Sequence, residues 1–277
     1  MARHEEGFFS AKDNLRLFWE SDVPDEPRAH IALVHGYADH SGRYRGVINA
    51  LVEQGFAVHA FDYRGHGQSG GRRGHCDRFD DFLDDLEVHW ERVRAAAGGR
   101  KLFLLGHSHG ALMSILFQKR EPKDLSGLLL SAPYLQLALK PSPLKVFSSK
   151  MIGKVIPWLP VRNPLEPELL TREPELQRQV ARDHLYNQVV TPRWFTESNR
   201  AQLEAFALAP SIQVPTLVFW GSADRIAAPA ATKRFCEVLG AKDKSCREYP
   251  EVLHEPMNDV GREQVWSDIS GWISKHL

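Results

Sequence analysis

Residues 102–113 of this chain read Leu102-Phe103-Leu104-Leu105-Gly106-His107-Ser108-His109-Gly110-Ala111-Leu112-Met113. The first four residues form an apolar run of strand length, and the apolar residues from Leu112 onward recur at helical spacing. Between them lies Gly-x-Ser-x-Gly, a pattern typical of a sharp strand-to-helix turn that exposes a nucleophilic serine. Gly106 and Gly110 suit such a turn because a side chain at either position would collide where strand and helix cross. We therefore predict that Ser108 is a nucleophile.

The composition is that of an ordinary globular protein. Its 35 basic and 35 acidic residues cancel, so no strong electrostatic field is available to attract nucleic acid. Three cysteines, Cys76, Cys236 and Cys246, show neither a disulfide framework nor zinc-ligand spacing, and we expect them to be reduced. No apolar run resembles a signal peptide, and none is long enough to span a bilayer. We predict a cytoplasmic protein without nucleic-acid partners.

Alternating strand and helix patterns predict an α/β protein with a mostly parallel sheet. A hairpin of two strands is expected first, at one edge of the sheet, over residues 7–10 and 15–19. Apolar runs of strand length, with helical patterns between most of them, then follow at 30–34, 57–61, 102–105, 127–131 and 215–220. A last strand is expected at 245–249. Strand-helix-strand order implies parallel strands joined by crossover helices that cover both faces.

Residues 134–209 interrupt this alternation of strand and helix patterns. Ten of the 17 prolines fall between Pro133 and Pro210, and so proline-rich a stretch cannot supply interior strands. We expect a helical cap inserted at the carboxyl edge of the sheet, between the two parts of a core made of residues 1–133 and 210–277. Short helices are predicted at 144–156 and 173–180. The alternative left open is a pair of ordinary core helices.

The loop at 65–70 contains Gly-x-Gly-x-x-Gly, which also occurs in dinucleotide-binding loops. That fingerprint requires a helix opening at the last glycine and an acidic residue ending a strand about 20 residues further on. Here Gly71-Arg72-Arg73-Gly74 continues the loop, and the carboxylates near that distance lie within a predicted helix. We interpret the segment as a glycine-rich loop bordering the site and expect no cofactor.

A serine hydroxyl becomes nucleophilic only beside a base, and the base needs a carboxylate to orient it. His254 is the candidate base because, of 13 histidines, it alone lies in a loop between a late strand and the final helix. Asp224 is the candidate acid because it follows a late strand and keeps the chain order Ser, Asp, His. No carboxylate follows the strand at 127–131 before Glu166, and Asp259 would break the chain order because it comes after His254. An aspartate that only caps a turn and an inert histidine remain the alternatives.

Acyl transfer also needs backbone donors for the developing oxyanion. The N–H groups of Tyr37 and His109 are predicted to supply them, because Tyr37 follows a strand end and His109 opens the helix after the serine. The side chains of His107 and His109 flank a tight turn and are expected to point apart, with no thiol or carboxylate cluster beside them. We therefore predict no metal.

Four segments and the His254 loop carry a family resemblance. The segments are His35-Gly36-Tyr37-Ala38-Asp39-His40-Ser41-Gly42-Arg43-Tyr44, Gly65-His66-Gly67-Gln68-Ser69, Gly106-His107-Ser108-His109-Gly110 and Gly221-Ser222-Ala223-Asp224-Arg225. In this order they resemble the monoacylglycerol lipase and lysophospholipase family of α/β hydrolases. The resemblance implies a serine esterase of monoacyl lipids, with a mobile apolar cap that forms an acyl tunnel. It assigns the triad to Ser108, Asp224 and His254, and the oxyanion donors to Tyr37 and His109. The family commonly has a small residue at the position of Tyr37 and Met at that of His109.

The sequence thus predicts hydrolysis of a small-molecule carboxylic ester through an acyl-Ser108 intermediate. Cap residues Phe147, Met151, Ile152 and Trp158 are predicted to bind the substrate, and the apolar cap could also contact a membrane or micelle. A medium or long acyl chain is expected, because each buried methylene contributes roughly 0.8 kcal/mol. An aminopeptidase, thioesterase or acyltransferase, or a non-catalytic ligand-binding protein, remains the alternative. For a peptidase, the carboxylates that could bind the substrate amine are Glu166, Glu168, Glu173 and Glu197.

Overall fold

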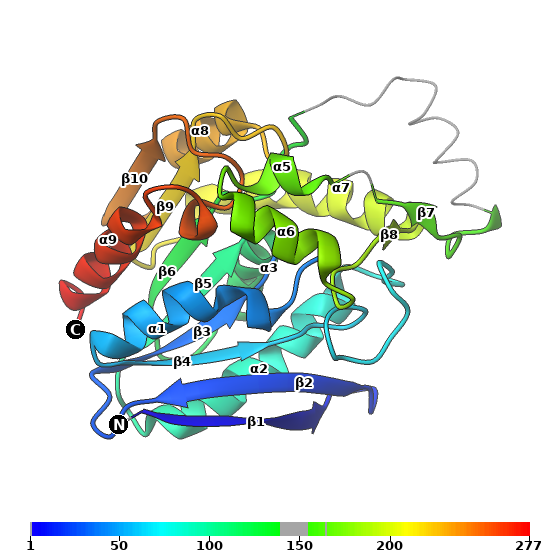
Figure 1. The fold of residues 1–277 in the computed structure, drawn as a ribbon. Helices are drawn as coiled ribbons and strands as arrows, with labels where there is room; N and C mark the ends of the chain where they lie inside the picture. The colour runs from blue at the N-terminus through cyan, green and yellow to red at the C-terminus, as the bar shows by residue number, and fades with distance from the viewer. Residues whose placement is uncertain (1, 139–154, 164) are drawn as a thin grey trace.

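A computed structural model describes residues 2–138, 155–163 and 165–277 of the chain (Figure 1). An eight-stranded sheet at its centre has the order β1-β2-β4-β3-β5-β6-β9-β10. The strands are β1 Arg3–Ser10, β2 Arg16–Val23, β3 Ala29–Val34, β4 Phe56–Phe61, β5 Leu102–His107, β6 Leu125–Ser131, β9 Thr216–Gly221 and β10 Lys244–Tyr249. β2 pairs antiparallel with β1 and with β4, and the other neighbours are parallel. The predicted α/β class, with a hairpin at one edge, is confirmed.

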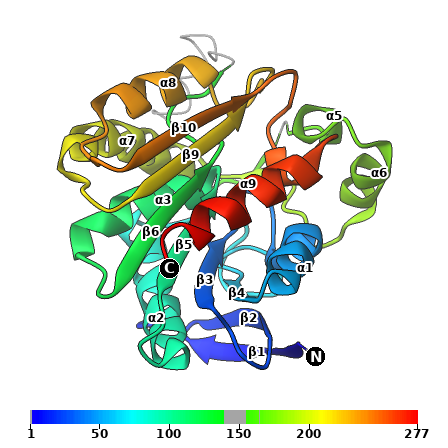
Figure 2. The ribbon, with the colours of Figure 1, turned by 90° about the vertical axis from the view of Figure 1, so that its left-hand side faces the viewer.

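Helices cover both faces of the sheet (Figure 2). Those of the core are α1 Arg45–Glu53, α2 Asp80–Ala97, α3 His109–Phe117, α8 Pro229–Val238 and α9 Arg262–Ser274, and a 3-10 turn, η1 Ser41–Tyr44, precedes α1. Side chains of α1 and α9 pack on one face, and those of α2, α3 and α8 on the other.

The central strands contribute side chains to the hydrophobic cores on both faces of the sheet. β3, β4, β5 and β9 are buried along their whole length, as continuous apolar runs predict for strands covered on both sides. Successive side chains alternate between the faces, so Ala32 and Val34 pack with α2 and α3 while Ile31 and Leu33 pack with α1 and α9. This packing holds the carboxyl ends of the parallel strands at one edge.

The predicted insertion contains α5 Pro167–Leu170, α6 Pro174–Arg182 and α7 Pro192–Leu208, with two-residue strands β7 Val161–Arg162 and β8 Val189–Val190 that pair outside the main sheet. The helix expected at 173–180 is present as α6, whereas the one expected at 144–156 lies almost wholly outside the described residues. In Figure 2, α5 and α6 lie at the right-hand side of the molecule, above α1. α7 buries Trp194, Ala201 and Ala205 in the core beside α3. The division into core and cap therefore stays a prediction, and α7 joins the two parts.

Cys236 and Cys246 form a disulfide between α8 and β10. The expectation of reduced cysteines is wrong for this pair, and Cys76 is a buried free thiol. The spacing could not reveal the pair, because only packing brings the edge strand beside α8. The cytoplasmic location loses this support and stays a prediction. Among the described helices, none has the length and apolar character needed to cross a bilayer.

Candidate active site

Ser108 lies at the strained turn between β5 and α3. Its φ of 52° is in the left-handed region, which side-chain-bearing residues seldom adopt. A Cβ on Gly106 would lie 2.6 Å from the carbonyl oxygen of Gly110. A Cβ on Gly110 would lie 2.3 Å from the carbonyl oxygens of both Val34 and His35. The turn therefore has the form predicted, and glycine is required on either side of the serine.

The loops after β9 and β10 bring Asp224 and His254 to this serine. His254 Nε2 lies 2.8 Å from Ser108 Oγ, and His254 Nδ1 lies 2.7 Å from Asp224 Oδ2. The other carboxylate oxygen of Asp224 accepts hydrogen bonds from the N–H groups of Ile226 and Ala227, which hold it in place. With Nδ1 donating to the carboxylate, Nε2 is left to accept the serine proton. The geometry is that of a nucleophile, a general base and an orienting acid.

The electrostatic surroundings of His254 favour its protonated form. Burial alone would lower the pKa of this histidine, but the hydrogen-bonded Asp224 carboxylate, together with the negative charges of Glu255 and Asp39, raises it above its ordinary value of 6.5. A raised pKa makes the neutral imidazole a stronger proton acceptor, which suits the task of a general base.

The N–H groups of Tyr37 and His109 are available as donors. Among the described residues, neither group donates a hydrogen bond. The Tyr37 hydroxyl donates to the carbonyl of Val189, and its ring packs 4.0 Å from that of Trp194. The bulk of Tyr37 is thus directed toward the insertion, which explains how a tyrosine fits where the related family commonly has a small residue.

The two histidines that flank Ser108 have different partners. His107 Nδ1 lies 3.1 Å from Ser131 Oγ, whereas the His109 ring is enclosed by aromatic side chains with Nε2 3.4 Å from Ser198 Oγ. Burial lowers the pKa of His109 to about 3. Both rings are held separately, as predicted, and His109 is neutral at ordinary pH.

A cavity of about 470 Å³ opens beside Ser108 and His254. Much of its wall is apolar, with Ile226 from the loop after β9, and Leu137, Leu165 and Trp194 from residues 134–209. Asp39, Arg43 and Glu255 add a polar sector. The cavity can therefore hold a largely apolar molecule against the serine.

The predicted substrate-binding residues do not account for this wall. Phe147, Met151 and Ile152 lie outside the described residues, and their role stays a prediction. Trp158 is 49% exposed and borders a second, smaller pocket with residues such as Arg72 and His75.

The main aromatic group that sequence reasoning missed is Trp194, near the start of α7. The sequence did contain a signal for the start of this helix, because Thr191 is its N-cap and Pro192 occupies its first turn.

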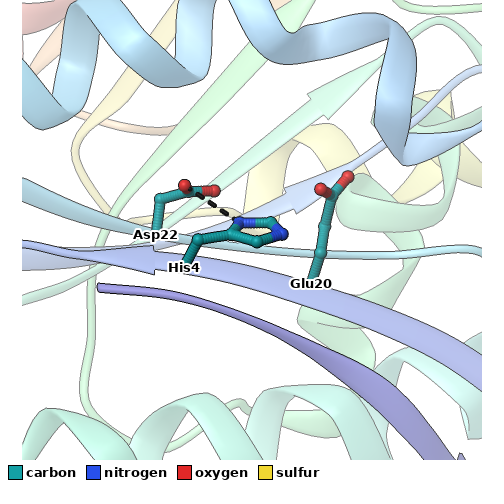
Figure 3. Close-up of side chains that lie close together, drawn as sticks. All are labelled: His4, Glu20 and Asp22. Carbon is teal, nitrogen blue, oxygen red and sulfur yellow. Dashed lines mark hydrogen bonds and ion pairs between the residues drawn. The ribbon is translucent and has the colours of Figure 1, made fainter. Parts of the chain in front are cut away.

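One group of metal-ligating side chains occurs among the described residues, away from Ser108 on the β1–β2 hairpin. It consists of His4, Glu20 and Asp22 (Figure 3). His4 already hydrogen-bonds to Asp22, and Arg45 Nη2 lies 2.7 Å from Glu20 and 2.8 Å from Asp22. The guanidinium already serves as the counter-ion of both carboxylates, so we assign no metal here.

The fold and the serine turn define an α/β hydrolase, and residues 25–261 match the family described as serine aminopeptidase, S33. The chain belongs to this family. It is 30% identical over 274 residues to a monoacylglycerol lipase of Mycolicibacterium smegmatis, covering 97% of this chain and 96% of the relative. It is 30% identical over 255 residues to human monoglyceride lipase, covering 90% and 83%. The crystal structure of Paleococcus ferrophilus monoacylglycerol lipase superposes with a TM-score of 0.83 at 30% identity, covering 100% of both chains.

Proposed function

We propose that this protein is a serine hydrolase that cleaves carboxylic esters of monoacyl lipids, of the monoacylglycerol or lysophospholipid type. The observation that carries the proposal is the hydrogen-bond chain from Ser108 through His254 to Asp224 at the wall of an apolar cavity. The similarity to monoacylglycerol lipases over nearly the whole chain supports the same substrate class.

The geometry supports acyl transfer in the following steps. Ser108 Oγ attacks the ester carbonyl while His254 Nε2 accepts its proton, and Asp224 stabilises the resulting imidazolium. The N–H groups of Tyr37 and His109 donate to the oxyanion. His254 then protonates the departing alcohol, which leaves an acyl-Ser108 ester. Water, activated by the same histidine, hydrolyses this ester and releases the fatty acid.

The acyl chain would occupy the apolar part of the cavity. Each methylene removed from water contributes roughly 0.8 kcal/mol, so a longer chain should raise kcat/KM until the cavity is full. Residues 134–209 act as the cap in this proposal. Its described part exposes apolar side chains at Val155, Ile156, Trp158, Leu159 and Val161, which would let the cap contact a membrane or micelle.

The family description raises a second candidate, an aminopeptidase. A peptidase of this kind needs a free carboxylate near the serine to bind the substrate amine. Asp39 and Glu255 line the cavity, but both are hydrogen-bonded to Arg43. The glutamates proposed from the sequence, Glu166, Glu168, Glu173 and Glu197, are not among the residues lining it. A neutral ester therefore suits the cavity better than a cationic amine.

Labelling with a fluorophosphonate probe tests the nucleophile. We expect labelling of the wild type and of Ser114→Ala, a control on the same helix, and none of Ser108→Ala. Undiminished labelling of Ser108→Ala would refute the assignment. A p-nitrophenyl ester series should favour decanoate over acetate. Faster turnover of an aminoacyl anilide than of any ester would instead establish the aminopeptidase, and comparison with thioesters and with alcohol acceptors would identify a thioesterase or acyltransferase.

A further inference from the structure

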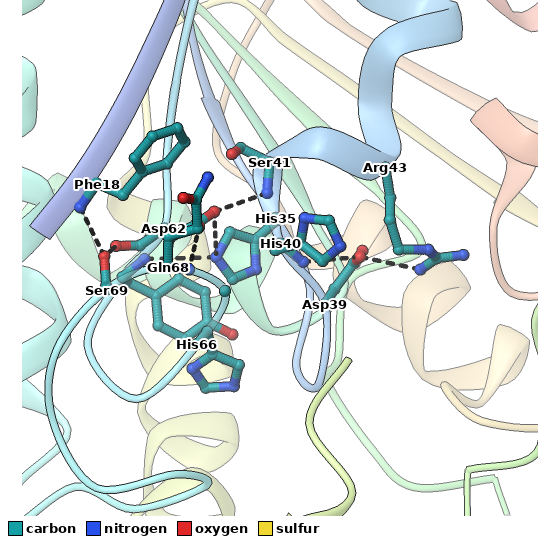
Figure 4. Close-up of polar contacts among 12 residues, drawn as sticks. Phe18, His35, Asp39, His40, Ser41, Arg43, Asp62, His66, Gln68 and Ser69 are labelled. Atoms are coloured by element: carbon teal, nitrogen blue, oxygen red, sulfur yellow. Dashed lines mark hydrogen bonds and ion pairs between the residues drawn. The ribbon is translucent and has the colours of Figure 1, made fainter. Parts of the chain in front are cut away.

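A buried cluster of charges lies next to the catalytic residues. Arg43 Nη1 donates to Asp39 Oδ1 and to Glu255 Oε1, both at 2.9 Å, and Arg43 Nη2 donates to Glu255 Oε2 at 2.9 Å. The exposed fractions of the three side chains are 10% for Arg43 and 4% for each carboxylate. The two parallel bonds to Glu255 form the fork in which arginine binds a carboxylate most specifically. Figure 4 shows the Arg43 side chain directed at Asp39.

The cluster joins two loops that serve the reaction. We call residues 35–40, which include Tyr37, the oxyanion loop, and residues 250–255, which end in His254 and Glu255, the histidine loop. Asp39 lies in the first loop and Glu255 in the second, and Arg43 connects them. Tyr44 extends the connection, because its hydroxyl donates to Asp39 at 2.8 Å and accepts the N–H of Gly36 at 3.3 Å.

The oxyanion loop has an anchor of its own on the opposite side. The Asp62 carboxylate accepts the N–H groups of Ser41 and Gln68, each at 2.8 Å (Figure 4). Ser41 directly follows the oxyanion loop, so this contact ties the end of that loop to Gln68 of the glycine-rich loop without involving the histidine loop. Loss of the Arg43–Glu255 fork would therefore leave the oxyanion loop in place and release the histidine loop from it.

Such a fork is poorly explained by stability alone. A buried ion pair gains little over well-packed apolar side chains, because both charges must be taken out of water. Its value here lies in geometry. The base and the oxyanion donors must converge on a single carbonyl group, and a displacement of about 1 Å can cost about 100-fold in rate.

We propose that Arg43 and Glu255 are positioning residues for acyl transfer, and that their ion pair sets the position of the His254 imidazole relative to the oxyanion N–H of Tyr37. The inference rests on the proposed ester hydrolysis. It assigns these two residues a function through His254 and not through the substrate.

Two variants separate geometry from charge. Glu255→Gln keeps the shape and one bond of the fork, and we expect kcat to fall about 10- to 100-fold with KM within about threefold. His254 is faced by Asp224, Glu255, Asp39, Arg43 and His107, so removal of one carboxylate should also move the acid limb of kcat/KM to lower pH. Arg43→Lys keeps the positive charge but not the fork, so it should lower kcat with the acid limb nearly unchanged.

The matched control is a fork of the same kind away from the cavity. Arg64 Nε and Nη2 bind the buried Asp85 at 2.8 and 2.7 Å, and neither residue lines the cavity. Asp85→Asn should lower the unfolding free energy and leave kcat per active site unchanged. Fluorophosphonate titration of Ser108 counts the active sites in every preparation.

Three results would overturn the inference: a kcat of Glu255→Gln within twofold of wild type, a loss confined to KM, or an equal loss of kcat in Asp85→Asn. If Glu255→Gln does not fold, Glu255→Asp shortens the fork and keeps the charge. Its kcat should also fall about tenfold or more, and an unchanged kcat would again overturn the inference. A wild-type protein that turns over no ester would instead refute the proposed function itself, which is a distinguishable failure.

Discussion

Substitution of Gly110 by alanine is the most direct test of the serine turn. The added Cβ would lie 2.3 Å from the carbonyl oxygens of both Val34 and His35, about 0.7 Å short of the 3.0 Å below which real Cβ contacts are essentially never seen. Both obstructing atoms belong to the backbone at the end of β3, so no flexible side chain can give way. Overpacking of this kind costs about 3 kcal/mol, the upper end of the usual range. The higher helix propensity of alanine relative to glycine offsets this cost by about 1 kcal/mol.

We therefore expect Gly110→Ala to lower the unfolding free energy by about 2 kcal/mol in urea titrations followed by tryptophan fluorescence. The strand and helix that must separate carry the oxyanion loop and Ser108, so kcat per active site should fall about 10- to 100-fold as well. Gly271→Ala in α9 is the matched control. No atom lies within 4 Å of its added Cβ, so this variant should be about 1 kcal/mol more stable than wild type and fully active.

The reasoning fails if Gly110→Ala is as stable and as active as the wild type. It also fails if the two alanine variants shift the unfolding free energy equally, because the clash at the turn would then have no measurable effect. Loss of stability with unchanged kcat would refute the geometric link between the turn and the oxyanion donors.

Three further predictions concern pH and the disulfide. The acid limb of kcat/KM should have its midpoint above pH 6.5, because His254 must be neutral to accept the serine proton and its pKa is raised; a midpoint below 6.5 in a pH–rate series would contradict this. His30 and His59 are in contact at 2.9 Å, and burial lowers their pKa values to about 4 and about 3. The unfolded chain takes up protons near pH 6.5 and the folded chain does not, so the unfolding free energy should fall from pH 6.5 toward pH 4, by up to about 1.4 kcal/mol per pH unit for each histidine. His59→Gln should flatten this slope in urea titrations, and an unchanged slope would rule out the histidine pair as its source. The disulfide spans a sequence separation of 10, so Cys246→Ser should lower the unfolding free energy by about 3 kcal/mol; a Tm equal to that of the wild type would show that the cross-link contributes nothing.

Much of the architecture could be predicted because its signals are local. Apolar runs of strand length matched β3, β4, β5, β6 and β9, and the helix expected after the glycine-rich loop is α2, which ends at Gly98 in the left-handed conformation typical of a helix cap. The serine turn could also be predicted from the sequence, because glycines such as Gly106 and Gly110 are needed where a strand and a helix cross so closely. Chain order after each strand was enough to select Asp224 and His254 as partners for the serine.

The walls of the site had no such local signal. Trp194, Leu165 and Ile226 meet around one cavity although they come from separate segments, and each looks like an ordinary apolar residue in the sequence. The same holds for the Arg43–Glu255 fork and for the Cys236–Cys246 disulfide. None of these contacts is encoded by spacing.

Sequence alone therefore determined the order of strands and helices and the glycine-flanked turn at Ser108, because periodicity and turn chemistry act over a few neighbouring residues. Tertiary structure decided which surfaces face the serine, how far Glu255 lies from Arg43 and which cysteines meet. These depend on how helices and loops pack across the sheet, where residues far apart in the chain become neighbours. The free energy of such a contact depends on both packed surfaces, so neither segment alone reveals it.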